Sequence, residues 1–207
     1  MARRAYKSRE PYRIKHCVIA LDQSYARTGI AIAVDGKLKV IKSIDFKHVK
    51  TKTSKRNLLR KTLSNAIITC LKKYSSSDIN VIFERVRTFT GSDILNVNYI
   101  KETGALCASI IDTATEFGIE CWSADTRAWK SSVLGTSKPS TEPYPGVKDP
   151  KKILDVKFIV ELGYGDAISI RRGHGNKGFA KYDDDAADAA CIALYGFKIK
   201  NTLQKEV

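Results

Sequence analysis

Two short apolar segments that each end on a carboxylate most strongly limit the folds open to this chain. Cys17–Asp22 reads CVIALD, and residues 81–84 read VIFE. Apolar runs of this length predict buried strands. Since ligands of α/β sheets gather beyond the carboxyl ends of the strands, Asp22 and Glu84 are predicted to lie at a ligand-binding edge.

The remaining pattern predicts the order of the elements. Asp35-Gly36 is a favoured two-residue hairpin turn, and it would join strands at residues 29–34 and 38–46. Helical spacing or capping signals then predict helices at 56–73, 93–117, 126–134, 150–162 and 183–195, with a fifth strand at 119–122. A three-stranded meander followed by alternating helices and strands predicts an α/β fold with a central mixed five-stranded sheet flanked by helices.

The chain is long enough for one domain, expected at residues 17–197 with inserted loops at 136–149 and 163–182. Residues 1–16 form a basic N-terminal arm in this prediction, and 198–207 a C-terminal tail. The loop at 163–182 is rich in glycine and basic residues, and both a DNA clamp and a linker remain open for it. Because no apolar run approaches ~18 residues, a membrane span is not expected.

Charge and cysteine content narrow the classes of function. The 36 Lys and Arg outnumber the 22 Asp and Glu, which gives a net charge of +14. Such a balance favours nucleic acid as the partner, although an acidic membrane surface would suit the same bulk charge. The five cysteines form no Cys-x-x-Cys pair, so reduced thiols of an intracellular protein are expected and a zinc site is not.

The last predicted helix supplies two further acids. Asp185 and Asp188 are spaced i, i+3 and share one helix face with Ile192, which places them toward the sheet. Asp183 and Asp184 would cap the helix. Hard oxygen ligands that converge from three segments are what a pair of Mg²⁺ ions needs for phosphodiester hydrolysis. Taken singly, each acid also fits a plainer role as a turn former, a helix cap or half of an ion pair.

Three blocks of the sequence resemble the RuvC family of Holliday junction resolvases, especially its phage-like branch. The first block runs from Val18 through Asp22 to Thr28-Gly29, the second is VIFE followed by Arg85, and the third is Asp185-Ala-Ala-Asp188-Ala-Ala. All three occur in the order of the family, and the third is the most specific. The common Asp-Pro-Gly-Ser turn of the family reads Asp22-Gln23-Ser24 here.

The resemblance implies a ribonuclease H-like fold and a homodimer that cuts opposite strands of a four-way DNA junction, leaving 5′-phosphates. It implies two Mg²⁺ ions per active site, replaceable by Mn²⁺, held by Asp22, Glu84, Asp185 and Asp188. Lys130 is expected near the scissile phosphate, ahead of Lys151 or Lys152. The expected DNA-binding residues are Arg85, Arg87, Phe89, Lys130, Lys151, Lys152, Arg171 and Arg172. The expected location is the cytoplasm of a bacterial or phage-infected cell, at the nucleoid.

Other functions remain open at this point. A nuclease of the same fold that acts on flaps, forks or RNA would carry the same acids, and a non-catalytic junction-binding protein would keep the same fold. Actin-like and sugar-kinase ATPases share an Asp-led first hairpin. They need two such domains around a nucleotide, for which 207 residues are too few.

Overall fold

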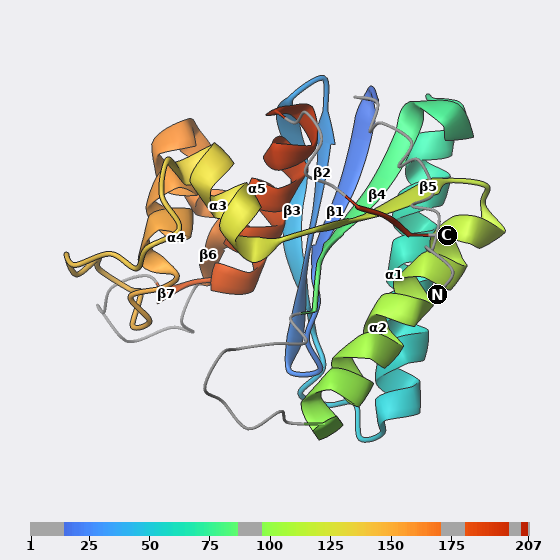
Figure 1. Cartoon of the computed structure of the whole chain (residues 1–207), viewed down its shortest axis with the longest axis horizontal. Coiled ribbons are helices and arrows are strands. Elements are labelled where there is room, and N and C mark those ends of the chain that lie inside the picture. Colours follow the sequence, from blue (N-terminus) through green and yellow to red (C-terminus); the bar gives the residue numbers. More distant parts are fainter. Residues whose placement is uncertain (1–14, 87–96, 171–180, 199–203, 207) are drawn as a thin grey trace, which may run out of the picture.

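A six-stranded mixed sheet forms the centre of the computed structural model, which describes residues 15–86, 97–170, 181–198 and 204–206 (Figure 1). The strand order is β3-β2-β1-β4-β5-β8. β1 pairs with β2, β2 with β3 and β5 with β8 in antiparallel fashion, whereas β1–β4 and β4–β5 are parallel. The strands are β1 (Cys17–Asp22), β2 (Arg27–Val34), β3 (Lys37–Asp45), β4 (Ile79–Glu84), β5 (Glu120–Ala124) and β8 (Gln204–Glu206).

The first three strands form the predicted meander. Asp35 and Gly36 connect β2 to β3, and both have positive φ, 48° and 76°. This left-handed pair matches the twist of a two-residue hairpin, so the predicted turn is confirmed. The same meander aligns Asp22 at the end of β1 with Gly29 in β2, a pairing on which the candidate site depends.

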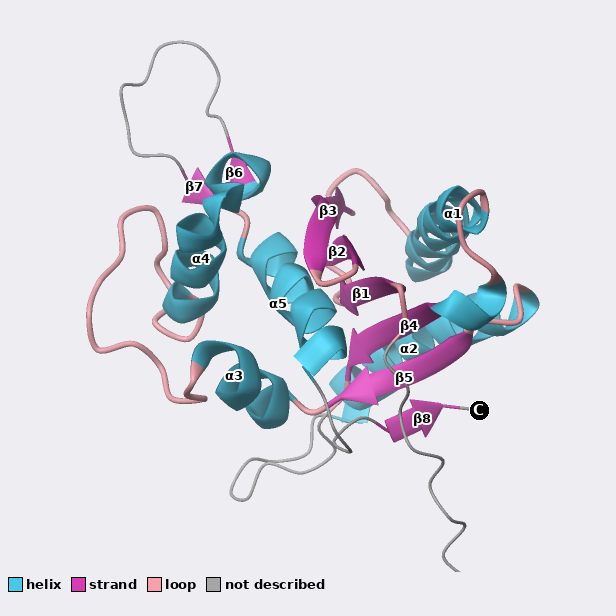
Figure 2. Cartoon of the chain, turned by 90° about the horizontal axis from the view of Figure 1, so that it is seen from above, coloured by secondary structure: helices cyan, strands magenta, loops and turns pink. Residues whose placement is uncertain are grey.

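Helices cover both faces of the sheet (Figures 1 and 2). α1 (Lys52–Leu71) and α2 (Val97–Glu116) lie on one face, and α5 (Asp184–Lys198) lies on the other. α3 (Thr126–Leu134) and α4 (Ile153–Ile159) pack on the outer side of α5. A π-helical turn (Val160–Tyr164), 3₁₀ turns (Ser76–Asp78 and Gly165–Ile168) and the short hairpin strands β6 (Ser169–Ile170) and β7 (Lys181–Tyr182) complete the described elements.

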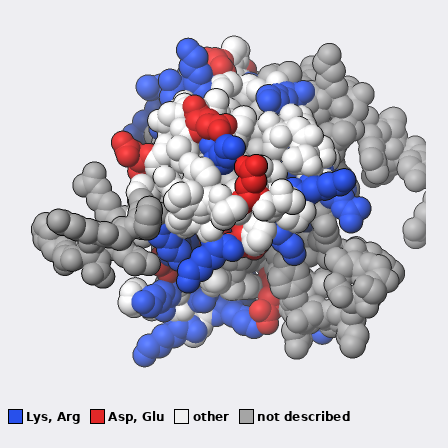
Figure 3. All heavy atoms as spheres, turned by 90° about the vertical axis from the view of Figure 1, so that its left-hand side faces the viewer, with Lys and Arg blue, Asp and Glu red and all other residues white. Residues whose placement is uncertain are grey.

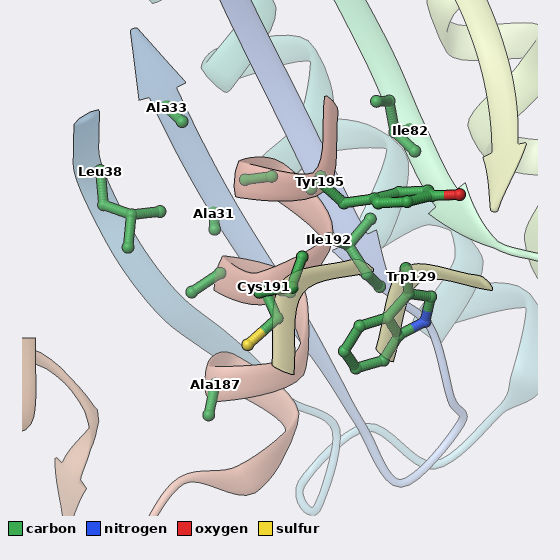
Figure 4. Packing of buried hydrophobic residues seen from close by; sticks show 14 of the residues in the cluster. Ala31, Ala33, Leu38, Ile82, Trp129, Ala187, Cys191, Ile192 and Tyr195 are labelled. Atoms are coloured by element: carbon green, nitrogen blue, oxygen red, sulfur yellow. The ribbon is translucent and has the colours of Figure 1, made fainter. Parts of the chain in front are cut away.

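α5 lies close to the sheet because small residues meet there: a Cβ added at Gly29 of β2 would lie 3.0 Å from the Ala189 Cβ of α5. Ala31 and Ala33 of β2 and Ala187, Cys191 and Ile192 of α5 belong to the buried cluster shown in Figure 4. Further along the helix, a Cβ added at Gly196 would lie 2.8 Å from the Ile82 Cδ1 atom. This close approach lets the first turn of α5 reach the ends of the central strands.

Several boundaries differ from the predictions. The sheet has six strands rather than five, because Gln204–Glu206 in the expected tail pairs with β5. A charged three-residue segment has no apolar alternation, so its pairing through the backbone leaves no sequence signal. The helix expected at 150–162 begins at Ile153 and continues as a π turn to Tyr164, and the last helix extends to Lys198. The expected start of the helix at 93–117 lies outside the described residues.

The described part of the chain contains no helix that is long and apolar enough to cross a membrane.

Candidate metal centre

The ends of two parallel strands bring the first two acids together. β1 and β4 are neighbours in the sheet, with Leu21 aligned to Phe83, so Asp22 and Glu84 follow at the same edge. Gln23 strengthens this edge, because its side-chain amide donates a 2.6 Å hydrogen bond to the Glu84 carbonyl. Position 23, which departs from the common Asp-Pro-Gly-Ser turn, therefore ties one acid-bearing strand end to the other.

α5 brings Asp185 and Asp188 to the same edge, and Gly29 sets how close the helix comes. A Cβ at Gly29 would lie only 1.9 Å from the Asp185 carbonyl oxygen, so the backbones of β2 and α5 are nearly in contact. Gly29 is the partner of Asp22 in the β1–β2 ladder. The Asp185 carboxylate is consequently close enough to contribute to the raised pKa of Asp22.

Asp183 has the capping role that the sequence predicted. Its carboxylate accepts hydrogen bonds from the Ala186 backbone N–H at 3.1 Å and from the Ser43 hydroxyl at 2.5 Å, and Arg27 lies 3.7 Å away. Oxygens of Asp183, Asp184 and Asp185 all lie within 4.8 Å of one another, which makes this acidic cluster compatible with metal binding. Asp185 is the member of this cluster whose charge acts on Asp22 and Lys152.

Burial makes the ionised form of this acidic group costly. It is the main cause that raises the pKa of Asp22 well above its ordinary value, with the Asp188 carboxylate adding to it. The pKa of Glu84 is also raised, first by burial, and the pKa of Asp185 rises to about 6 for the same reason. Buried carboxylates that repel each other need a cation nearby to remain ionised.

Lys152 supplies that cation in the structure. Its ammonium forms an ion pair with Asp188 and lies 3.6 Å from the Asp22 carboxylate. Burial opposes the charged form of Lys152, but the carboxylates of Asp188 and Asp22 outweigh it and raise the pKa of the lysine. The sequence placed Lys152 behind Lys130 as the lysine of the site, whereas the structure puts Lys152 among the acids.

Lys130 does not contact the four predicted acids but binds Asp155, which was not among the predicted site residues. Its ammonium contacts the Asp155 carboxylate at 2.5 Å and the Lys151 carbonyl oxygen at 3.0 Å. Asp155 is fully buried, and burial followed by the Asp188 charge raises its pKa to about 8. An acid within the apolar stripe of α4, between Ile153 and Val156, is the sequence signal that marks it.

Glu84 is held from α3 by uncharged donors. The Thr126 hydroxyl donates to Glu84 Oε1 at 2.6 Å, and the Trp129 indole N–H donates to Oε2 at 3.2 Å. Both bonds lower the pKa of Glu84 and so oppose the effect of its burial. Neither donor was among the predicted site residues, although Trp129 directly precedes Lys130.

The expected DNA-binding residues are spread over several surfaces. Arg85 follows Glu84 and donates to the Ser123 hydroxyl at 3.2 Å, while Lys151 is exposed next to Lys152. Four further members lie outside the described residues: Arg87, Phe89, Arg171 and Arg172. Figure 3 views the side of the molecule formed by α3 and α4, where most basic side chains lie around the edge and acidic side chains lie among uncharged residues in the centre.

The donor set fits divalent cations. The buried Oδ1 atom of Asp188 has no hydrogen-bond partner among the described groups, and its charge helps to raise the pKa values of Asp22, Glu84 and Asp185. Several hard oxygens around one point are the ligands that Mg²⁺ and Mn²⁺ prefer. Asp22, Glu84, Asp185 and Asp188 remain the residues that we expect to hold such ions.

Comparison with solved structures identifies the fold. The chain resembles Thermus thermophilus RuvC with a TM-score of 0.58 and 12% identity, covering 92% of this chain and 99% of that one. The same protein in complex with a Holliday junction substrate gives a TM-score of 0.56 and 11% identity, covering 92% and 99%. The yeast mitochondrial Holliday junction resolvase Ydc2 gives a TM-score of 0.43 and 13% identity, covering 90% and 79%.

No protein-family model matches the sequence, and no curated protein does. The structural likeness to RuvC shows that the α/β fold is ribonuclease H-like, as the sequence resemblance implied.

Proposed function

We propose that the protein is a metal-dependent, structure-selective DNA endonuclease that resolves four-way junctions by paired symmetric phosphodiester hydrolysis. The observation that carries the proposal is the position of Asp22 and Glu84 at one sheet edge, where the Lys152 ammonium pairs with Asp188 and lies 3.6 Å from Asp22. The Asp185 charge acts on both Asp22 and Lys152. A likeness to RuvC, one structure of which contains a Holliday junction substrate, supports this choice of substrate.

Each residue would have a distinct role at this edge. Asp22 lies between the other acids and would be shared by two cation sites, with Glu84 on one side and Asp185 and Asp188 on the other. Divalent ions bound there would activate water and neutralise the developing charge on phosphate. Lys152 would lose its carboxylate partners to the ions, and its ammonium would then be available to contact a phosphate oxygen.

The partners follow from charge and symmetry. A net charge of +14 favours a polyanionic substrate, and Arg85, Lys130 and Lys151 are proposed to contribute to DNA binding near the site. Because a homodimer presents two identical sites related by a two-fold axis, it would suit symmetric incisions across a junction. The proposed products carry 5′-phosphates, and action in the cytoplasm at the nucleoid agrees with a DNA substrate.

The test compares a labelled four-way junction with a matched duplex and a flap, in Mg²⁺, in Mn²⁺ and with a chelator. Paired nicks in the junction alone are expected from the wild-type protein. Asp185→Asn should reduce cleavage at least about a thousandfold, since it removes several kcal/mol of metal-dependent stabilisation. Asp166→Asn, an exposed acid outside the cluster, serves as the matched control.

The other functions give different results in the same assay. If flaps are cut as efficiently as the junction, the protein is still a nuclease, but its substrate range is broader than four-way junctions. Tight junction binding without cleavage in either metal would overturn the enzymatic proposal and favour a structural binding protein.

A further inference from the structure

Both carboxylate oxygens of Glu84 are held by side chains of one short helix. Thr126 and Trp129 are three positions apart in α3, so their side chains project from the same helix face. The Thr126 hydroxyl donates to Oε1 at 2.6 Å and the Trp129 indole N–H to Oε2 at 3.2 Å. A glutamate side chain held at both oxygens loses the rotamer freedom that it would have at an open strand end.

The helix that carries these donors is itself fixed in place. Its N-cap, Asp125, accepts from the backbone N–H groups of Arg127 and Ala128 at 2.9 and 3.2 Å, and Gly135 ends the helix with a φ of 77°. The Trp129 ring is fully buried in the core cluster between α3 and α5 (Figure 4). A donor on so constrained a ring has little freedom to leave its acceptor.

The chemistry of the two donors suits an acid that must also bind a cation. The indole N–H and the hydroxyl are uncharged, and each occupies one acceptor site of a carboxylate oxygen that has two. Each Glu84 oxygen therefore keeps a lone pair for a divalent ion. Lys152 differs from these two uncharged donors, because its positive charge competes with a metal ion for Asp188 and Asp22.

We propose that Thr126 and Trp129 are positioning residues that fix the Glu84 carboxylate in the orientation needed to coordinate a divalent cation. The proposal rests on the proposed function in that Glu84 is taken as a metal ligand. Partners of this kind around a ligand contribute about 10- to 100-fold in metal affinity or activity.

The experiment measures Mn²⁺ binding to the full chain by calorimetry, without DNA, beside the Mg²⁺ dependence of junction cleavage. The key variants are Thr126→Val and Trp129→Phe, which remove a donor while preserving most of the side-chain shape. Each should weaken Mn²⁺ binding about 10- to 100-fold. Thr126→Ser, which keeps the hydroxyl, should restore affinity to within a fewfold of wild type. Junction binding in the absence of metal should not change.

Two control variants separate positioning from packing. Trp122→Phe alters another buried indole, and Thr113→Val removes a hydroxyl that donates to the Ser109 carbonyl within α2. Both should leave Mn²⁺ affinity unchanged even where they lower the melting temperature. If Thr126→Val and Trp129→Phe likewise leave Mn²⁺ affinity unchanged while Glu84→Gln weakens it, the positioning role is overturned and the nuclease proposal stands.

Two further outcomes complete the test. If Glu84→Gln has no effect on Mn²⁺ binding, Glu84 is not a ligand and the positioning proposal fails as well. If the metal-binding results are as expected but no junction is cut, the positioning role holds and only the proposed reaction is lost.

Discussion

The two faces of the sheet are built on different principles. α1 and α2 pack through long aliphatic side chains such as Leu59, Leu63 and Ile110, and the buried polar side chains of α2, such as Thr113, are uncharged. α5 packs through alanines, and the buried layer beside it also contains Asp155 and Asp188. The α1–α2 face buries mainly apolar surface, whereas the α5 face buries less of it and brings charged groups near the strand ends.

Because the two faces differ in this way, mutations on them should affect stability and cleavage activity differently. On the α1–α2 face, lost volume should weaken folding without moving the acids. On the α5 face, a change of a single methyl group should displace the acids, because the helix and β2 are nearly in backbone contact at Gly29.

Gly29→Ala should have the largest effect. Its Cβ would overlap the Asp185 carbonyl, so the first turn of α5 must move. We expect junction cleavage to fall at least about 100-fold, as displacements near 1 Å can cause, and stability to fall by about 3 kcal/mol. Urea unfolding and cleavage of a labelled junction measure both effects.

A matched glycine lies on the opposite face of the sheet. A Cβ at Gly104 in α2 would meet nothing within 4 Å, so Gly104→Ala should raise stability by about 0.5–1 kcal/mol. Equal destabilisation by the two variants would contradict the contrast between the faces.

Leu63→Ala should cause a similar loss of stability with a different consequence. The side chain is fully buried in the cluster under α1, and its truncation should lower the free energy of unfolding by about 3 kcal/mol. At a temperature where the variant remains folded, junction cleavage should stay within about twofold of wild type. A cleavage loss as large as that of Gly29→Ala would show that the two faces are not independent.

The smallest expected effect concerns pH. Burial, chiefly, raises the pKa of Asp185 to about 6 and of Asp155 to about 8, so the folded state binds these protons more tightly than the unfolded state. Their contribution to stability is complete below the unfolded pKa near 4 and is lost as pH rises through the folded values. In chelator, the free energy of unfolding should fall as the pH rises from 5.5 to 8.5.

Two additions sharpen this measurement. Mg²⁺ should stabilise the protein more at pH 8 than at pH 5.5, because its ligands must be deprotonated. Asp155→Asn should flatten the pH dependence of the metal-free protein. A stability that rises with pH in chelator would contradict the assignment of buried, proton-retaining carboxylates.

The sequence predicted the succession of the central strands along the chain and the position of Asp22 and Glu84 at strand ends because both depend on local patterns. An apolar run that ends on an acid places Asp22 and Glu84, and helical spacing places Asp185 and Asp188 on one face. It ranked Lys130 ahead of Lys152, whereas Lys152 is the lysine that pairs with Asp188 and lies near Asp22, because this position depends on where α4 begins and how it rests on α5. It also gave no reason to link Thr126 or Asp155 to the acids, since these contacts form only when separate elements pack together.

The contact between Gly29 and Asp185 also has a consequence for how the protein assembles. The β1–β2–β3 meander is continuous in sequence and can pair early, whereas α5 is the last helix described and must close a very long loop to reach it. No partly folded chain that lacks this step can present all four acids together. Metal binding at this site would therefore select the completed fold, and the stabilisation would grow with the logarithm of the free ion concentration above the dissociation constant.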